Sequence, residues 1–110
     1  MGNCQAGTAR KVAVKIVIQS SALADLADGF NFYERNEPGL GSYFLDSLYA
    51  DIDLLNFYAG IHMIHFGKYH RLLSKKFPYG IYYLVKEDSV VVRAVLDLRR
   101  DPEQIKRRLG

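Results

Sequence analysis

The sequence has few of the features that mark secreted or membrane-spanning proteins. It holds one cysteine, Cys4, among its 110 residues, so it cannot form an internal disulfide, which fits a reducing cytosol. No apolar run approaches the ~20 residues that a membrane-spanning helix needs. The chain does not open with the charged and then apolar segment of a signal peptide. We therefore expect a cytoplasmic protein.

Patterns that bind metals or phosphates are also sparse. The His62-x-x-His65 spacing could chelate a metal on a helix, but residues 61–66 read as extended, where an offset of three puts side chains on opposite faces. Gly39-x-Gly41 lacks the strand-to-helix context and third glycine of a phosphate-binding loop. The sequence predicts no metal site and no cofactor.

Charge is distributed unevenly along the chain. Its length predicts a single domain at residues 12–110, preceded by a flexible tail at residues 1–11. Residues 1–66 hold four Lys/Arg and seven Asp/Glu, net −3, whereas residues 67–110 hold eleven and five, net +6. A basic half indicates an acidic partner, either nucleic acid or an acidic protein segment. The alternative is a solvated basic face with no binding role.

Helical spacing of apolar residues predicts two helices in the first half of the chain. They cover about residues 20–35 and 42–57, and Ser20 or Ser21 can cap the first. The expected buried positions are Leu23, Leu26, Ala27, Phe30 and Tyr33 in the first helix and Leu45, Leu48, Ile52 and Leu55 in the second. Pro38-Gly39 favours a short loop between them, so the helices should form an antiparallel hairpin.

Strands account for most of the remaining chain. Period-two alternation predicts strands at residues 12–18, 69–77, 79–86 and 90–97, with a short edge strand at 61–66. The expected faces of the central pair are Tyr79, Ile81, Tyr83 and Val85 on one strand and Val90, Val92, Ala94 and Leu96 on the other. A short basic helix starts at Pro102. The predicted class is α+β: a two-helix hairpin on a four- to five-stranded, mainly antiparallel sheet, ordered β-α-α-β-β-β(-β), with a short C-terminal helix.

Cations and tyrosines of the basic half are the candidate binding residues. Arg and Lys can neutralise phosphates or acidic side chains, and a neighbouring tyrosine can stack on a nucleic-acid base. Tyr82 should point away from the face that Tyr79 and Tyr83 share, although packing is the commoner role of a strand tyrosine. In the predicted sheet the cations can gather near one region. The candidate partner- or target-binding residues are Arg71, Lys75, Lys76, Tyr82, Arg93, Arg99 and Arg100.

A likeness to a known family rests on the order and spacing of several short segments. In the central strands they are Phe77-Pro-Tyr-x-Ile-Tyr-Tyr and Val92-Arg-Ala-Val-Leu-Asp-x-Arg-Arg-Asp-Pro. Upstream they are Ala24-Asp-Leu, Phe32-Tyr-Glu and Pro38-Gly-Leu-Gly-x-x-Phe. Over about residues 14–109 the chain resembles the RelE/ParE family of toxins from bacterial type II toxin–antitoxin pairs. The resemblance implies a two-helix hairpin against an antiparallel sheet, with the first strand beside the last.

The resemblance implies one of two mechanisms. RelE-like members cut mRNA in the ribosomal A site with several Lys/Arg residues and a Tyr or His near the chain end, whereas ParE-like members poison DNA gyrase and lack that set. The first basic position of the RelE-like pattern falls on Arg71. The other positions fall on uncharged or acidic residues, namely Leu73, Gly80 and Asp97 or Leu98. No tyrosine follows Tyr83. The catalytic set is incomplete; an RNase of this kind would have to use Arg71, Lys75, Arg99 and Arg100.

The resemblance therefore favours a ParE-like toxin that inhibits DNA gyrase, serves plasmid stabilisation and is neutralised by a cognate antitoxin. A RelE-like ribosome-dependent endoribonuclease and a degenerate, non-catalytic binding protein of the same fold are the alternatives, and whether the chain is an enzyme stays open, with the balance against it. The implied partners are the antitoxin and either gyrase or the ribosome with its mRNA, without a membrane, as a homodimer or a toxin–antitoxin hetero-oligomer. We expect Arg99 and Arg100 to attract an acidic antitoxin segment; alternatively they pair with Asp97 and Asp101 or cap the final helix.

Overall fold

The computed structural model describes residues 15–58, 64–65, 68–87 and 89–110. Its elements, in chain order, are β1 (Lys15–Ile18), α2 (Ser20–Asn36), α3 (Leu40–Asp53), α4 (Leu55–Tyr58), β2 (Ile64–His65), β3 (Tyr69–Leu73), β4 (Tyr79–Val85), β5 (Ser89–Asp97) and α5 (Pro102–Leu109). The predicted tail at residues 1–11 and the first part of the strand predicted at 12–18 lie outside the described residues. None of the described helices is long and apolar enough to cross a membrane.

The sheet has five strands in the order β1-β5-β4-β3-β2. β1 runs parallel to β5, with Ile18 opposite Val92, and the other three pairs are antiparallel. The predicted α+β class, the C-terminal meander and the adjacency of the first and last strands are confirmed. The strand predicted at 69–77 ends at Leu73, since residues 75–78 bend into β4 and the Ser74 N–H closes this turn by donating to the Tyr79 carbonyl.

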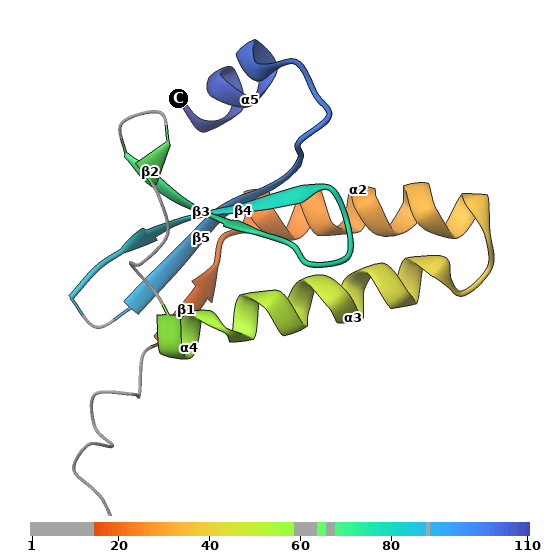
Figure 1. Ribbon diagram of the computed structural model, residues 1–110, viewed down its shortest axis with the longest axis horizontal. Helices are drawn as coiled ribbons and strands as arrows, with labels where there is room; N and C mark the ends of the chain where they lie inside the picture. The colour runs from red at the N-terminus through yellow and green to blue at the C-terminus, as the bar shows by residue number, and fades with distance from the viewer. Residues whose placement is uncertain (1–14, 59–63, 66–67, 88) are drawn as a thin grey trace, which may run out of the picture.

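Helices α2 and α3 form the predicted antiparallel hairpin and lie side by side along the sheet (Figure 1). Glu34, near the end of α2, accepts hydrogen bonds from the backbone N–H groups of Gly39 and Gly41, at 3.0 and 2.9 Å. Gly39 has a φ of 90°, a left-handed conformation that glycine adopts at little cost. One carboxylate therefore satisfies amide donors at the start of α3 and fixes the turn.

Two details of the helices differ from the sequence expectation. The helix predicted at 42–57 ends at Asp53, and α4 is a separate turn. The buried stripe of α2 is rotated, because Leu23 is 46% exposed and Phe30 lines a groove between α2 and α3. The residues of α2 that are buried are Ala22, Leu26, Gly29 and Tyr33. The expected and the observed sets of buried residues both recur at helical spacing, so periodicity alone could not show which set is buried.

The sheet is covered on both faces, which divides the core into two clusters. The hairpin buries one face, over Leu72, Tyr79, Ile81, Tyr83, Val90, Val92 and Val95. On the other face α5 packs Ile105 and Leu109 against Tyr69, Tyr82, Ala94 and Leu96. The predicted placement of Tyr79 and Tyr83 on one face and Tyr82 on the other is confirmed. In Figure 1, α5 (dark blue) lies on the opposite side of the sheet from α3 (yellow-green).

A β-bulge in β5 changes which residues face each cluster. Tyr83 pairs with Val92, but Tyr82 pairs with Ala94, so Arg93 is an extra residue on β5. Side-chain alternation reverses at such a residue. The prediction that Val90, Val92, Ala94 and Leu96 share one face is therefore wrong beyond Val92, and Val95 takes the next place in the cluster beneath the hairpin.

Candidate functional site

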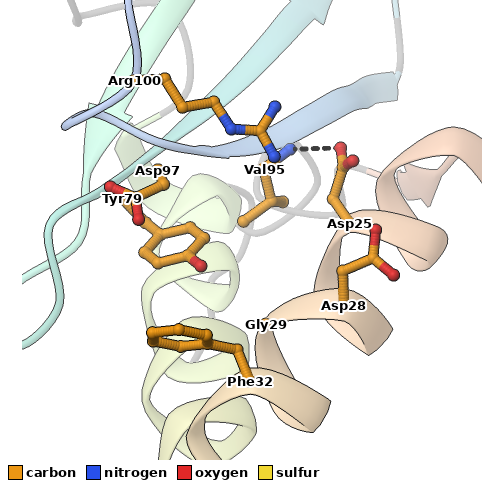
Figure 2. A pocket seen from close by; sticks show the side chains of 8 residues that line it. All are labelled: Asp25, Asp28, Gly29, Phe32, Tyr79, Val95, Asp97 and Arg100. Carbon is orange, nitrogen blue, oxygen red and sulfur yellow. Dashed lines mark hydrogen bonds between the residues drawn. The ribbon is translucent and has the colours of Figure 1, made fainter.

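A cavity of about 190 Å³ opens between α2 and the ends of β4 and β5. Its lining residues are Asp25, Asp28, Gly29, Phe32, Tyr79, Val95, Asp97 and Arg100. Figure 2 shows Asp25, Asp28 and Phe32 projecting from α2, with Tyr79, Asp97 and Arg100 facing them from the sheet and the turn after it. Acidic and basic side chains thus meet where the sheet, the hairpin and the turn before α5 come together.

The start of α2 forms one wall of this cavity, because it lies along the part of β5 that β1 is too short to pair with. β1 ends at Ile18, opposite Val92, and beyond that point backbone groups of β5 bind α2 instead. The hydroxyl of Ser21 donates to the Arg93 carbonyl at 2.8 Å. The predicted cap by Ser20 or Ser21 is wrong, because the N-cap position has no side-chain hydrogen bond and Ser21 binds the sheet.

Asp25, one turn further along α2, also binds the backbone of β5. Its Oδ2 accepts from the Val95 N–H at 3.0 Å and from Arg108 Nη2 at 2.6 Å. Arg108 Nη2 also donates to the Ser21 carbonyl at 3.0 Å, so α5 is tied to the start of α2. Burial raises the pKa of the Asp25 carboxyl above its ordinary value, although the Val95 N–H and the Arg108 guanidinium oppose that rise.

Tyr79 forms the floor of the cavity. The residue is 7% exposed, and its hydroxyl makes no hydrogen bond to any residue that the structure describes. The hydroxyl lies on the cavity side of the ring, facing α2 (Figure 2). Burial raises the pKa of Tyr79 to about 12, and the nearby Tyr33 and Asp97 act in the same direction. The phenol is therefore neutral at pH 7, with its oxygen available to a ligand.

The charged groups at the mouth are partly paired. Arg99 donates to both oxygens of Asp97, with Nη2 at 2.6 Å from Oδ2 and Nε at 2.9 Å from Oδ1, which lowers the pKa of Asp97. The alternative in which Arg99 pairs with Asp97 is thus confirmed. Asp101 instead caps α5 by accepting from the Glu103 N–H. Within the described residues, the side chains of Arg100 and Asp28 have no hydrogen bond or ion pair.

The six candidate cations do not gather in one patch. Lys75 and Lys76 lie beside α3, where the Lys75 N–H donates to Asp51 and Lys76 lies over the ring of Tyr43. Arg93 Nη1 donates to Gln19 at the opposite edge of the sheet. The expected gathering is wrong because the turn after β3 points toward α3, whereas the bulge directs Arg93 toward α2.

Four positions of the RelE-like pattern do meet on the face of the sheet that α5 covers in part. Leu73 is paired with Gly80 in the sheet register. A Cβ on Gly80 would lie 3.0 Å from Leu98 Cδ2 and 3.1 Å from Arg71 Cδ. The Arg71 Nε is buried and has no hydrogen-bond partner within the described residues. Of these four side-chain positions, only Arg71 carries a charge.

Tyr82, a predicted binding residue, lies on this same face but is fully buried. It packs beneath Ile105 and Leu109, so in this structure a partner could reach it only after α5 moved. His70 stacks on Tyr83, with ring centroids 5.1 Å apart. In the described part of the chain, no three His, Cys, Asp or Glu side chains come together as a metal site. His62 lies outside those residues.

Sequence reasoning missed Asp28, Phe32 and Tyr79 as a set. The spacing of Asp25, Asp28 and Phe32 places all three on one face of a helix, and this signal could have been read. Nothing in the sequence showed that Tyr79 and Asp97 would lie opposite that face, since their position depends on the sheet register.

Comparison with known proteins bears on the fold. Neither a protein-family model nor a curated protein matches the sequence. A solved structure described as "Chromosomal ParDE TA system from P. aeruginosa" superposes with a TM-score of 0.73 at 13% sequence identity. The match covers 79% of this chain and 98% of that one. The chain therefore has a RelE/ParE-like fold that spans nearly the whole of the solved chain.

Proposed function

We propose that this protein is the toxin of a type II toxin–antitoxin module, held inactive by a cognate antitoxin. The observation that carries the proposal is the fold shared with the ParDE structure, a TM-score of 0.73 over 98% of that chain. The independent sequence resemblance to RelE/ParE toxins over residues 14–109 supports the same conclusion. Fold alone does not fix function, so the target must come from the site.

We propose a ParE-like action on DNA gyrase. The support is the apolar character of the face where RelE-like members carry their cations, since Leu73, Gly80 and Leu98 surround Arg71 there. A phosphoryl-transfer site depends on charges fixed at the transition state, and losing one such group typically costs ~10²–10³ in rate. A site in which one of these four positions holds a guanidinium suits binding to a protein better than cleavage of RNA.

The proposed antitoxin has a suitable surface on the hairpin. A groove of about 290 Å³ runs between α2 and α3, lined by Leu23, Leu26, Ala27, Phe30, Asn31, Leu45 and Tyr49. Leu23 and Tyr49 are 46% and 39% exposed, which is more than core residues allow. An amphipathic segment of the antitoxin, disordered when free, would cover this apolar groove on binding.

Induced expression in bacteria, with and without the neighbouring small reading frame, tests the proposal. We expect growth arrest that coexpression relieves, gyrase-linked DNA breaks in the arrested cells and intact mRNA on their ribosomes. Codon-dependent cleavage in the A site, lost in Arg71→Ala, would replace the gyrase target with the RelE-like one. Growth without arrest, from soluble folded protein, would contradict the toxin function and leave the degenerate binding protein.

A further inference from the structure

We propose that the cavity between α2 and the ends of β4 and β5 is a binding site for the guanidinium group of an arginine side chain that a protein partner presents. The inference goes beyond the toxin function, because it concerns the side chain that the site takes, whichever protein carries it. It rests on the charge of the lining, on the phenol hydroxyl that Tyr79 turns toward the cavity and on the exposed ring of Phe32.

The lining favours a cation. Among the described residues that line the cavity, Asp25, Asp28 and Asp97 are carboxylates and Arg100 is the one cation. The guanidinium groups that pair with Asp25 and Asp97 belong to Arg108 and Arg99, which do not line it. Those two carboxylates are therefore already paired, and an entering cation would find Asp28 without an ion-pair partner in the described chain.

Tyr79 supplies a hydrogen-bonding group to the cavity. The residue is 7% exposed, and its hydroxyl faces the cavity without a hydrogen-bond partner in the described residues. The hydroxyl is not one of the buried unpaired atoms, so it is the part of Tyr79 that a ligand in the cavity can reach. With its pKa raised to about 12, the phenol stays protonated, and its oxygen can accept a hydrogen bond from an N–H donor.

Phe32 and the size of the cavity favour a planar side-chain group. Phe32 is 45% exposed at the rim, and its ring is held edge-to-face by Tyr33 at a centroid separation of 5.0 Å. A guanidinium can stack on such a ring while it donates to carboxylates in its plane. About 190 Å³ is below the ~300–1,000 Å³ of small-molecule pockets and suits a single side chain.

The chain's own Arg100 does not fill the site. Its side chain is exposed and forms no ion pair with Asp25, Asp28 or Asp97, although it lies near enough to lower the pKa of Asp25 and of Asp97. Arg100 therefore opposes an incoming cation. Removing it should strengthen binding of a guanidinium and weaken binding of an anion, so this variant reports the sign of the ligand.

The experiment titrates N-acetyl-L-arginine amide into the full chain and follows the ring resonances of Phe32 and Tyr79 by NMR. N-acetyl-L-citrulline amide, which has nearly the same shape without the charge, is the matched probe. We expect saturable shifts with the arginine probe and roughly tenfold weaker binding of the citrulline probe. Asp28→Asn should weaken arginine binding about two- to fivefold, and Arg100→Ala should tighten it.

Asp46→Asn is the matched control, because Asp46 is exposed on α3 and does not line the cavity. Its arginine titration should equal that of the unmodified protein. Unchanged ring shifts of Phe44 in each variant would show that the core is intact. Equal binding of both probes, shifts that do not saturate, or loss of binding in Arg100→Ala would each overturn the assignment.

Discussion

Arg108 of α5 and Asp25 of α2, 83 positions apart in the sequence, meet in an ion pair with 2.6 Å between Nη2 and Oδ2. The side chains are 28% and 11% exposed, so the pair is partly shielded from solvent. It joins the C-terminal helix to the start of the hairpin across the edge of the sheet.

Arg108→Gln should raise the pKa of Asp25 further, because it removes two interactions that favour the charged carboxylate. The raised pKa means that folded protein holds this proton more tightly than the unfolded chain. Asp25 therefore makes stability fall as pH rises from its ordinary value of 3.8 to the folded value, and the variant widens that window. Carboxyl NMR titration measures the shift.

The same variant should lower the free energy of unfolding at pH 7 by about 1–2 kcal/mol. Arg107→Gln is the control, since Arg107 is exposed on α5 without a side-chain bond in the described structure. Equal losses in the two variants would mean that the ion pair contributes nothing specific.

Gly29→Ala should destabilise the protein although alanine favours helix by about 1 kcal/mol. An added Cβ would lie 2.5 Å from two ring carbons of the buried Phe44, and overpacking of this kind costs about 1–3 kcal/mol. Asn31→Ala, on an exposed position of the same helix, should be neutral or stabilising. Denaturant unfolding gives both values; a stabilised Gly29→Ala protein would contradict the close packing of α2 on α3.

Ser21→Ala should cost about 1 kcal/mol, because the Arg93 carbonyl at the bulge loses the hydroxyl that donates to it. Ser20→Ala provides the comparison, since Ser20 is exposed and its side chain makes no hydrogen bond in the described residues. The melting temperature should therefore fall more in Ser21→Ala than in Ser20→Ala. If Ser20→Ala were the more damaging, the serine would be acting as the helix cap that the sequence suggested.

Asp51→Ala should cost about 1–3 kcal/mol and loosen the turn after β3. Asp51 is 4% exposed and accepts from the Ser74 hydroxyl at 2.8 Å and the Lys75 N–H at 3.3 Å. Asp53→Ala, at an exposed position two residues on, is the matched control. Amide exchange at Lys75 should accelerate in the first variant and stay unchanged in the second.

Arg100→Glu should slow association with the proposed antitoxin more than Arg99→Glu does, because Arg99 is already engaged by Asp97. The effect should shrink between about 0.05 M and about 0.5 M salt as screening increases. Arg99→Glu should mainly lower the melting temperature. Association rate constants measured at both salt concentrations test this expectation, with the melting temperature as the control. Rate constants that do not depend on salt would contradict an electrostatic role for Arg100.

The sequence predicted where the helices and strands lie better than which of their side chains are buried. Strand and helix periods gave every main element, since these depend on patterns within about ten residues, whereas the neighbouring first and last strands were implied by the family resemblance alone. The faces of β5 were not predictable, because Arg93 is an extra residue only relative to the register of β4. The buried side of α2 was ambiguous for a similar reason: two apolar stripes compete, and contact with Phe44 selects the one that contains Gly29.

The site was less predictable than the fold. Charge along the chain identified the basic half, but a charge count does not say that Arg99 is neutralised by Asp97 or that Lys75 turns toward α3. The cavity needs Tyr79 and Asp97 on paired strands opposite one face of α2, which is a property of tertiary contact.

The pairing of β1 with β5 sets the order in which the protein is completed during its synthesis. Ile18 and its neighbour Val92 are 74 positions apart, which corresponds to roughly 4–15 s of translation at ~5–20 residues per second. Once the hairpin has been made, its residues Leu26, Phe44 and Leu48 lack the strands that later bury them for the rest of that interval. A chaperone or partner present at the ribosome therefore meets an apolar surface that the finished protein no longer displays.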